Sequence, residues 1–130
     1  MQKKFISPET MPPTFGYSHV VEVSNAKRTI YISGQVAINT DGQIVGINDL
    51  ATQTRQVFEN IKIALEMSDL NFNDDVVKFF LTDISQMTIV RDIRDQYIDT
   101  NNPPASSAVE VRKLINDNLL IEIEAIAVAN

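Results

Sequence analysis

The side chains that this sequence offers for chemistry are carboxylates, hydroxyls and guanidiniums, since its 130 residues include no cysteine and one histidine. Without cysteine there is no disulfide, no thiolate nucleophile and no cysteine-ligated metal. One histidine does not make a histidine-rich metal site, and His19 starts a predicted strand without a serine or aspartate partner motif. We interpret His19 as structural, so a reactive site must come from acidic, hydroxyl and basic residues.

Composition and charge limit the class of partner. The chain has 17 acidic and 11 basic residues, a net charge of −6, and no basic cluster of more than two neighbours, which disfavours a nucleic-acid partner. No apolar run approaches the roughly 18 residues of a membrane span, and the N-terminal residues lack a signal-peptide pattern. We therefore expect a cytoplasmic protein with no membrane partner and one domain over residues 1–130.

The most specific pattern lies in residues 103–111, which read P-P-A-S-S-A-V-E-V. This segment resembles the signature P-P-A-R-S-x-V-E-V of the Rid proteins, also called the YjgF or L-PSP family. Five further stretches resemble the family's pattern in the same order, at residues 16–21, 31–35, 53–62, 76–83 and 121–127. Six matches in order cover nearly the whole chain, so it is identified as a member of this family.

The resemblance implies both a fold and a chemistry. It implies a chorismate-mutase-like α+β fold, with two helices on one face of a mixed sheet, and a homotrimer with clefts between subunits. In active members these clefts hydrolyse 2-aminoacrylate and related imines to 2-keto acids and ammonia, with neither a metal nor an organic cofactor. The implied partner is therefore a small metabolite that resembles a 2-keto or 2-imino acid.

The resemblance also implies which residues line the cleft. Tyr17 is expected to close it, with a hydroxyl that can bond a ligand or water. Ser33 and Gly34 are expected to approach the ligand at a strand end, where the missing Cβ of Gly34 permits close contact. Glu122 is expected to position the attacking water as the catalytic residue. Each role has a structural alternative. Tyr17 could lie at a subunit boundary, Ser33 and Gly34 could simply end a strand, and Glu122 could pair with a charge across the sheet.

Ser106 stands where the family signature has an arginine that grips the substrate carboxylate. A guanidinium binds a carboxylate through two charge-assisted hydrogen bonds, whereas serine offers one neutral hydroxyl. Losing both bonds costs about 3–6 kcal/mol, or roughly two to four orders of magnitude in turnover. The exchange predicts weak or absent imine deaminase activity, and we place Ser106 and Ala108, two residues further on, among the substrate-binding residues.

A cation elsewhere could take over the lost role. The second helix of many relatives reads V-N-x-x-Y, and the resemblance places Arg91 at the cleft-facing asparagine and Arg94 at the tyrosine. Arg91 could supply the missing charge from another wall of the cleft. The alternative is a surface arginine paired with Asp92 or Asp95. Arg112, further along the signature strand, is a weaker candidate.

Periodicity predicts the elements that position these residues. Strands are expected at residues 19–24, 28–33, 76–82, 106–112 and 119–128, with a short strand after Gly34-Gln35 and a possible one at residues 3–6. The first two would form a hairpin through residues 25–27. Helices are expected at residues 49–68 and 85–98, the second capped by Ser85. One sheet with both helices on a single face follows, and the last strand, apolar on both faces, predicts that subunit association covers the other face.

Three functions remain open at this point. From the sequence we favour a Rid-type trimer that binds a small metabolite without the standard imine deaminase activity. The second is an active 2-imino acid deaminase, a cofactor-independent hydrolase with Arg91 as its carboxylate anchor. The third is the ribonuclease or translation inhibitor activity long attached to the family name, which the negative charge and dispersed basic residues oppose.

Overall fold

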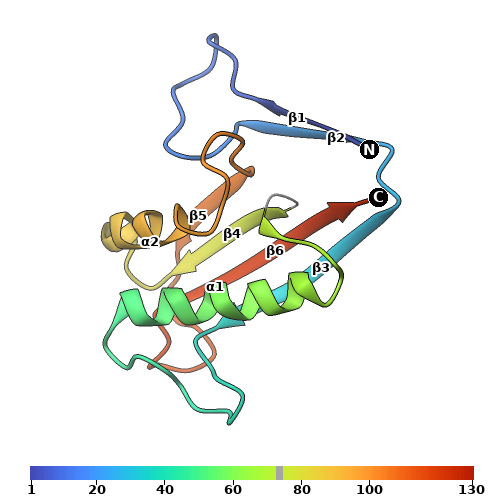
Figure 1. The fold of residues 1–130 in the computed structure, drawn as a ribbon. Coiled ribbons are helices and arrows are strands. Elements are labelled where there is room, and N and C mark those ends of the chain that lie inside the picture. Colours follow the sequence, from blue (N-terminus) through green and yellow to red (C-terminus); the bar gives the residue numbers. More distant parts are fainter. Residues whose placement is uncertain (73–74) are drawn as a thin grey trace.

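The computed structural model describes residues 1–72 and 75–130, and over these residues the chain has an α+β fold (Figure 1). Its elements in chain order are β1 (Gln2–Ile6), β2 (Val20–Ser24), β3 (Arg28–Val36), α1 (Leu50–Glu66), β4 (Asp75–Leu81), the 3-10 turn η2 (Ile84–Gln86), α2 (Met87–Arg94), β5 (Ser106–Glu110) and β6 (Ile121–Ala129). Four strands form one mixed sheet in the order β3-β6-β4-β5, with β4 and β5 parallel and the other neighbours antiparallel. The predicted fold class, with both helices on one face of the sheet, is confirmed.

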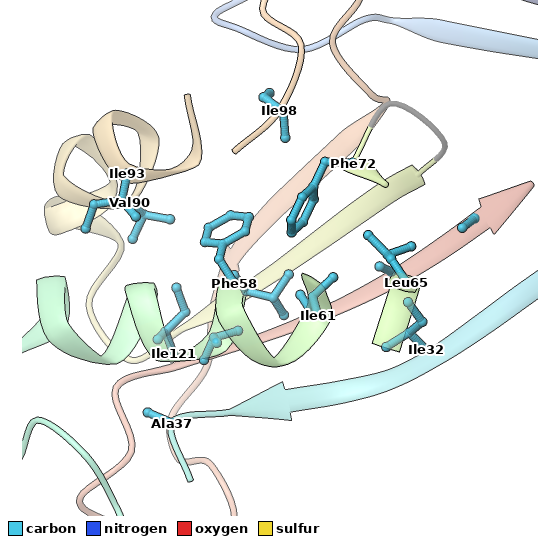
Figure 2. Close-up of a cluster of buried hydrophobic side chains, with 14 of the residues drawn as sticks. Ile32, Ala37, Phe58, Ile61, Leu65, Phe72, Val90, Ile93, Ile98 and Ile121 are labelled. Atoms are coloured by element: carbon cyan, nitrogen blue, oxygen red, sulfur yellow. The ribbon is translucent and has the colours of Figure 1, made fainter. Parts of the chain in front are cut away.

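The last strand and the long helix build the core between them. Alternate residues of β6 from Ile121 to Ala129 are buried, as the two-residue period of a strand requires. Residues of α1 at helical spacing, among them Val57, Ile61 and Leu65, are fully buried and belong to the same cluster (Figure 2). The helix begins where the Asp49 carboxylate accepts hydrogen bonds from the backbone N–H and the hydroxyl of Thr52.

The predicted hairpin of residues 19–24 and 28–33 is wrong. β2 pairs instead with β1 in a separate two-stranded sheet, whereas β3 pairs with β6. Asn25, in the connection, has a positive φ of 60° and turns the chain from one sheet to the other. The prediction of a single sheet is therefore also wrong. The possible strand at residues 3–6 exists as β1, and it takes the place of β3 as the partner of β2. The short strand expected after Gly34-Gln35 is reduced to one bridge between Ile38 and Ile44.

The second helix is shorter than the pattern predicts. It ends at Arg94 and not at residue 98, because turns follow at residues 95–97. The preceding 3-10 turn is capped by Asp83, whose carboxylate accepts hydrogen bonds from the backbone N–H and the hydroxyl of Ser85. Ser85 was expected to be the cap, but it donates to one. Because α2 has only eight residues, packing against α1 and the sheet must hold it in place.

The face of the sheet that the helices do not cover is only partly buried. The alternate residues of β6 from Glu122 to Val128 are intermediate in exposure, and Tyr31 on β3, which pairs with Ile126, is 77% exposed. Figure 1 shows no helix over this face. The expectation that association covers it concerns a second copy of the chain and stays a prediction.

Candidate functional site

A cavity of about 240 Å³ lies where α2, β5 and residues 15–17 meet. Its lining brings together four residues selected from the sequence, namely Tyr17, Arg91, Ser106 and Ala108. The remaining lining residues are Phe15, Met87 and Arg94. Residues 15–17 thus form one cavity together with segments some seventy to ninety residues further along the chain, and its lining contains both polar and apolar side chains.

Two simple periodicities place these side chains. Met87, Arg91 and Arg94 follow one stripe of α2, since residues four and seven apart share a helix face. Ser106 and Ala108 are two apart on β5 and share a face of the strand. Met87 and Arg94 are buried, whereas Arg91 is exposed. The cavity therefore has one guanidinium at its mouth and another in its wall.

Among the described residues, no neighbour neutralises the charge of Arg91. None of the described residues forms an ion pair or a side-chain hydrogen bond with its guanidinium. The expected alternative, pairing with Asp92 or Asp95, is not what the structure has. One oxygen of Asp95 accepts instead from Nε and Nη2 of Arg94, each at 3.0 Å. The uncompensated positive charge of the cavity is thus that of Arg91.

Tyr17 is fixed by its sequence neighbours. Ser18, 4% exposed, donates its backbone N–H to the carbonyl of Pro104 at 3.1 Å and its hydroxyl to the carbonyl of Pro103 at 2.6 Å. His19 holds the carbonyl of Pro12 through Nε2 at 2.6 Å, and its ring stands edge-on to that of Tyr17. These contacts are structural, in line with the interpretation of His19.

The remaining predicted site residues, Ser33, Gly34 and Glu122, form a second group at a β-bulge. The pairing of β3 with β6 shifts between Ile32 and Gln35, so that Ser33 and Gly34 lie in the irregular stretch. A Cβ on Gly34 would lie 2.7 Å from Cδ of Glu122, closer than real Cβ contacts occur. The lack of a side chain at Gly34 is therefore what lets the Glu122 carboxylate pass over the bulge.

The two groups lie on opposite faces of the sheet. Ser106 pairs with Val77, and Val77 pairs with Ala125, whose side chain is buried on the helix-covered face. Glu122 belongs to the alternate set of β6 residues and so faces the other way. Within one chain no small ligand can touch both Ser106 and Glu122. A site that used both groups would have to be completed by a second copy.

Tyr97, which follows α2 and has a shifted pKa, is not among the residues that line the cavity. Burial raises the pKa of the Tyr97 hydroxyl, helped by its hydrogen bond to Glu59 at 2.9 Å. The ring of Tyr97 stacks on Phe58 with the ring centroids 4.9 Å apart, which ties the turn after α2 to α1. Tyr97 therefore holds α2 against the core and does not itself face a ligand.

Two searches of the described residues set limits on other functions. Over residues 1–72 and 75–130, no group of three histidine or acidic residues lies close enough together to hold a metal ion. Within the same ranges, no helix has the length and apolar character needed to cross a membrane.

Comparison with known proteins agrees with the geometry. The family described as Endoribonuclease L-PSP matches residues 8–129. A RutC family protein of Pyrococcus abyssi is 38% identical, over 98% of both chains. A 2-iminobutanoate/2-iminopropanoate deaminase of Dermatophagoides farinae is 30% identical, over 97% of this chain and 96% of that protein. A structure from Yersinia pestis, of the conserved Rid protein family, superposes with a TM-score of 0.87 at 37% identity, covering 98% of this chain and 99% of that one.

An α+β fold with a mixed sheet and two helices on one face is thus shared along nearly the full length of solved relatives. The chain belongs to the L-PSP family, also called the Rid or YjgF family.

Sequence reasoning missed two features of the site. Whether Arg91 or Arg94 would replace the missing arginine was left open, and nothing in the sequence indicated that Asp95 takes up the charge of Arg94. Phe15 was not singled out at all, although it lines the cavity with a side chain that is 66% exposed. The signal in the sequence that could have identified Phe15 is an aromatic residue directly before Gly16 and Tyr17.

Proposed function

We propose that this protein is a 2-imino acid deaminase in which the carboxylate anchor has moved from position 106 to Arg91 on α2. The observation that carries the proposal is that Arg91 lines the same cavity as Ser106 and has no ion pair among the described residues. From the sequence alone we favoured loss of the activity, because the exchange at Ser106 removes a guanidinium. The cavity supports its replacement instead.

The chemistry follows from the groups at hand. The paired N–H donors of a guanidinium match the two oxygens of a carboxylate. With its carboxylate on Arg91, a 2-imino acid has its C=N carbon inside the cavity, near the hydroxyls of Tyr17 and Ser106. Water adds to that carbon and protons pass to the nitrogen. The C–N bond then breaks, so that the water oxygen becomes the keto oxygen of a 2-keto acid and ammonia leaves.

A water-positioning carboxylate has to come from a second copy. Glu122 lies on the opposite face of the sheet from Ser106, beside Gly34 at the bulge. We therefore propose clefts between copies, as in the expected trimer, in which one copy supplies the cavity and another supplies Glu122 and the bulge. The half-exposed outer face, with Tyr31 uncovered, supports such an association.

A metabolite-binding protein without deaminase activity is the second candidate. It is favoured by one observation, the separation of Glu122 from the cavity within the chain. If the copies do not bring the two groups together, Arg91 can still hold a small carboxylate, but among the described residues no acidic side chain lines the cavity to orient water.

The ribonuclease function is supported less well by the described residues. The chain carries a net charge of −6, and among the described residues that line the cavity Arg91 is the unpaired cation. An RNA strand is held by several cations and stacking aromatic side chains together.

The proposal is tested by removing the guanidinium at position 91 and then restoring one at position 106. Arg91→Gln should lower kcat/KM for 2-iminobutanoate, generated in situ by an amino acid oxidase, by about tenfold to a hundredfold for each charge-assisted bond that is lost. Adding Ser106→Arg to Arg91→Gln should then recover much of the loss. An inactive wild-type protein that gains activity from Ser106→Arg alone would instead establish the second candidate.

A matched control removes the same charge elsewhere. Arg55 on α1 donates to the side chain of Gln96 at 2.9 Å and is not among the cavity-lining residues. Arg55→Gln should leave kcat/KM nearly unchanged. An equal loss in Arg55→Gln and Arg91→Gln would show that only overall charge matters, and would remove the support for Arg91 as anchor.

A further inference from the structure

Arg94 differs from Arg91 in what it can offer a ligand. It is 3% exposed, and Asp95 accepts from its Nε and its Nη2. A buried charge persists only when it is paired, and this pair is neutral as a whole. Arg94 therefore lines the cavity without adding net charge to it, which leaves open what the buried guanidinium is for.

The guanidinium of Arg94 also lies against the backbone of Gly16. The backbone of Gly16 has a φ of 76°, and it lies so close to Arg94 that a Cβ there would overlap Nη2 and would sit 3.2 Å from Cζ. The chain thus passes against the Nη2 end of the guanidinium. Only glycine allows both the positive φ and the close approach.

Tyr17 is consequently fixed from both sides. The residue before it rests on the Arg94 guanidinium, and the residue after it, Ser18, is bonded to the carbonyls of Pro103 and Pro104. Since Pro103 and Pro104 lead into Ser106, the same contacts hold Tyr17 against the strand that carries Ser106. Little freedom is left for the backbone of Tyr17 between the two attachments.

We propose that Arg94 is a positioning residue, which sets the place of Tyr17 through the backbone of Gly16, while Arg91 alone holds the carboxylate. Its relevance to catalysis rests on the proposed function of the cavity. The role requires that Arg94 stay paired with Asp95, so that the Nη2 end of the guanidinium is held against Gly16. It also explains why two arginines on one helix face have different surroundings.

The first measurement is hydrogen exchange of the Ser18 amide by NMR, which requires no ligand. Arg94→Gln and Gly16→Ala should each accelerate exchange at Ser18 by about tenfold or more, because local opening of residues 15–18 becomes easier. Gly42→Ala is the matched control, because Gly42 has the same φ of 76° with no atom within 4 Å of an added Cβ. It carries the same backbone strain without the collision.

The second measurement is binding of 2-oxobutanoate by calorimetry. Arg94→Gln and Gly16→Ala should each weaken binding by about tenfold, and the double variant should be no weaker than either single one because both break the same contact. Gly42→Ala should bind as the wild type does. Arg91→Gln should weaken binding without changing exchange at Ser18.

Several results would overturn the inference. Faster exchange at Ser18 in Gly16→Ala but not in Arg94→Gln would show that backbone strain at residue 16, and not the contact with Arg94, matters. Asp95→Asn, which removes the ionic partner of Arg94, replaces Arg94→Gln in this comparison if that variant does not fold. Weaker binding in Arg94→Gln with unchanged exchange would make Arg94 a direct ligand contact. If the wild type binds no 2-oxo acid while exchange follows the expected pattern, the proposed function fails but the positioning role of Arg94 stands.

Discussion

The two faces of the four-stranded sheet differ in how far one chain completes them. On the helix-covered face, the β6 residues from Ile121 to Ala129 that point toward α1 are at most 4% exposed. On the outer face, Tyr31 is 77% exposed and Val109 is 45% exposed. The candidate site is divided in the same way, with the cavity on the covered side and the Glu122 carboxylate on the other.

The two faces are therefore expected to serve different purposes, the covered one stability and the outer one function. The covered face is a complete hydrophobic core that is formed by contacts within the chain. The outer face carries side chains of intermediate exposure together with the exposed Tyr31, as we expect if a second copy covers it. Changes on the two faces should accordingly have different consequences.

The largest expected effect contrasts the core with the outer face. Phe58→Ala removes a fully buried ring that packs on Phe72 and Tyr97, and should lower the free energy of unfolding by about 3–5 kcal/mol. Tyr31→Ala should change it by less than about 0.5 kcal/mol in the isolated chain. Urea denaturation at low protein concentration measures both. Similar losses at the two sites would mean that the faces do not differ as described.

A smaller effect is expected from the carboxylate on the outer face. Glu122→Gln keeps the shape of the side chain but removes its ability to accept a proton from water, and should lower kcat on 2-iminobutanoate by about a hundredfold or more while KM changes little. Glu124→Gln, two residues on and on the same face, is the matched control. A change in KM alone for Glu122→Gln would indicate a binding role and not water activation.

The smallest effect concerns the caps of the elements that cover the sheet. Hydrogen bonds from Thr52 and from Ser85 hold the pKa values of Asp49 and Asp83, respectively, below the ordinary 3.8. A pKa that is lower in the folded state means that each ionised carboxylate stabilises the fold above the unfolded value, and that this contribution is lost as pH falls through the folded pKa. Asp49→Asn and Asp83→Asn should therefore flatten the fall in stability below about pH 4.

Unfolding free energies measured between pH 2 and pH 7 test this point. Parallel curves for the wild type and the two variants would contradict it.

Much of the fold could be predicted because its signals are local. The period of α1 and the alternation in β6 depend on near neighbours, and both appear in the structure close to their expected bounds. The pairing of strands could not be predicted in the same way. Residues 19–24 and 28–33 have the spacing of a hairpin, but β1 and β6 compete for them, and that competition is settled by contacts between residues far apart in the chain.

The site shows the same limit. The family resemblance at residues 16–21 and 103–111 was sufficient to select Tyr17, Ser106 and Ala108, and the structure brings them together around one cavity. Helical spacing favours a pair between Arg91 and Asp95, four residues apart, and gives no reason to expect one between the neighbours Arg94 and Asp95. The choice of Arg94 depends on its burial beneath Gly16, which is a property of the assembled fold.

The position of β6 has a consequence for the order in which the protein can form during synthesis. β6 follows every other element in the chain, yet it lies between β3 and β4 and bonds to both. Until residues 121–129 have left the ribosome, β3 has no partner in the sheet and α1 has no completed surface to cover. The four-stranded sheet can therefore form only after β6 has been synthesised, and loss of these nine residues would remove the middle of the sheet and not an edge.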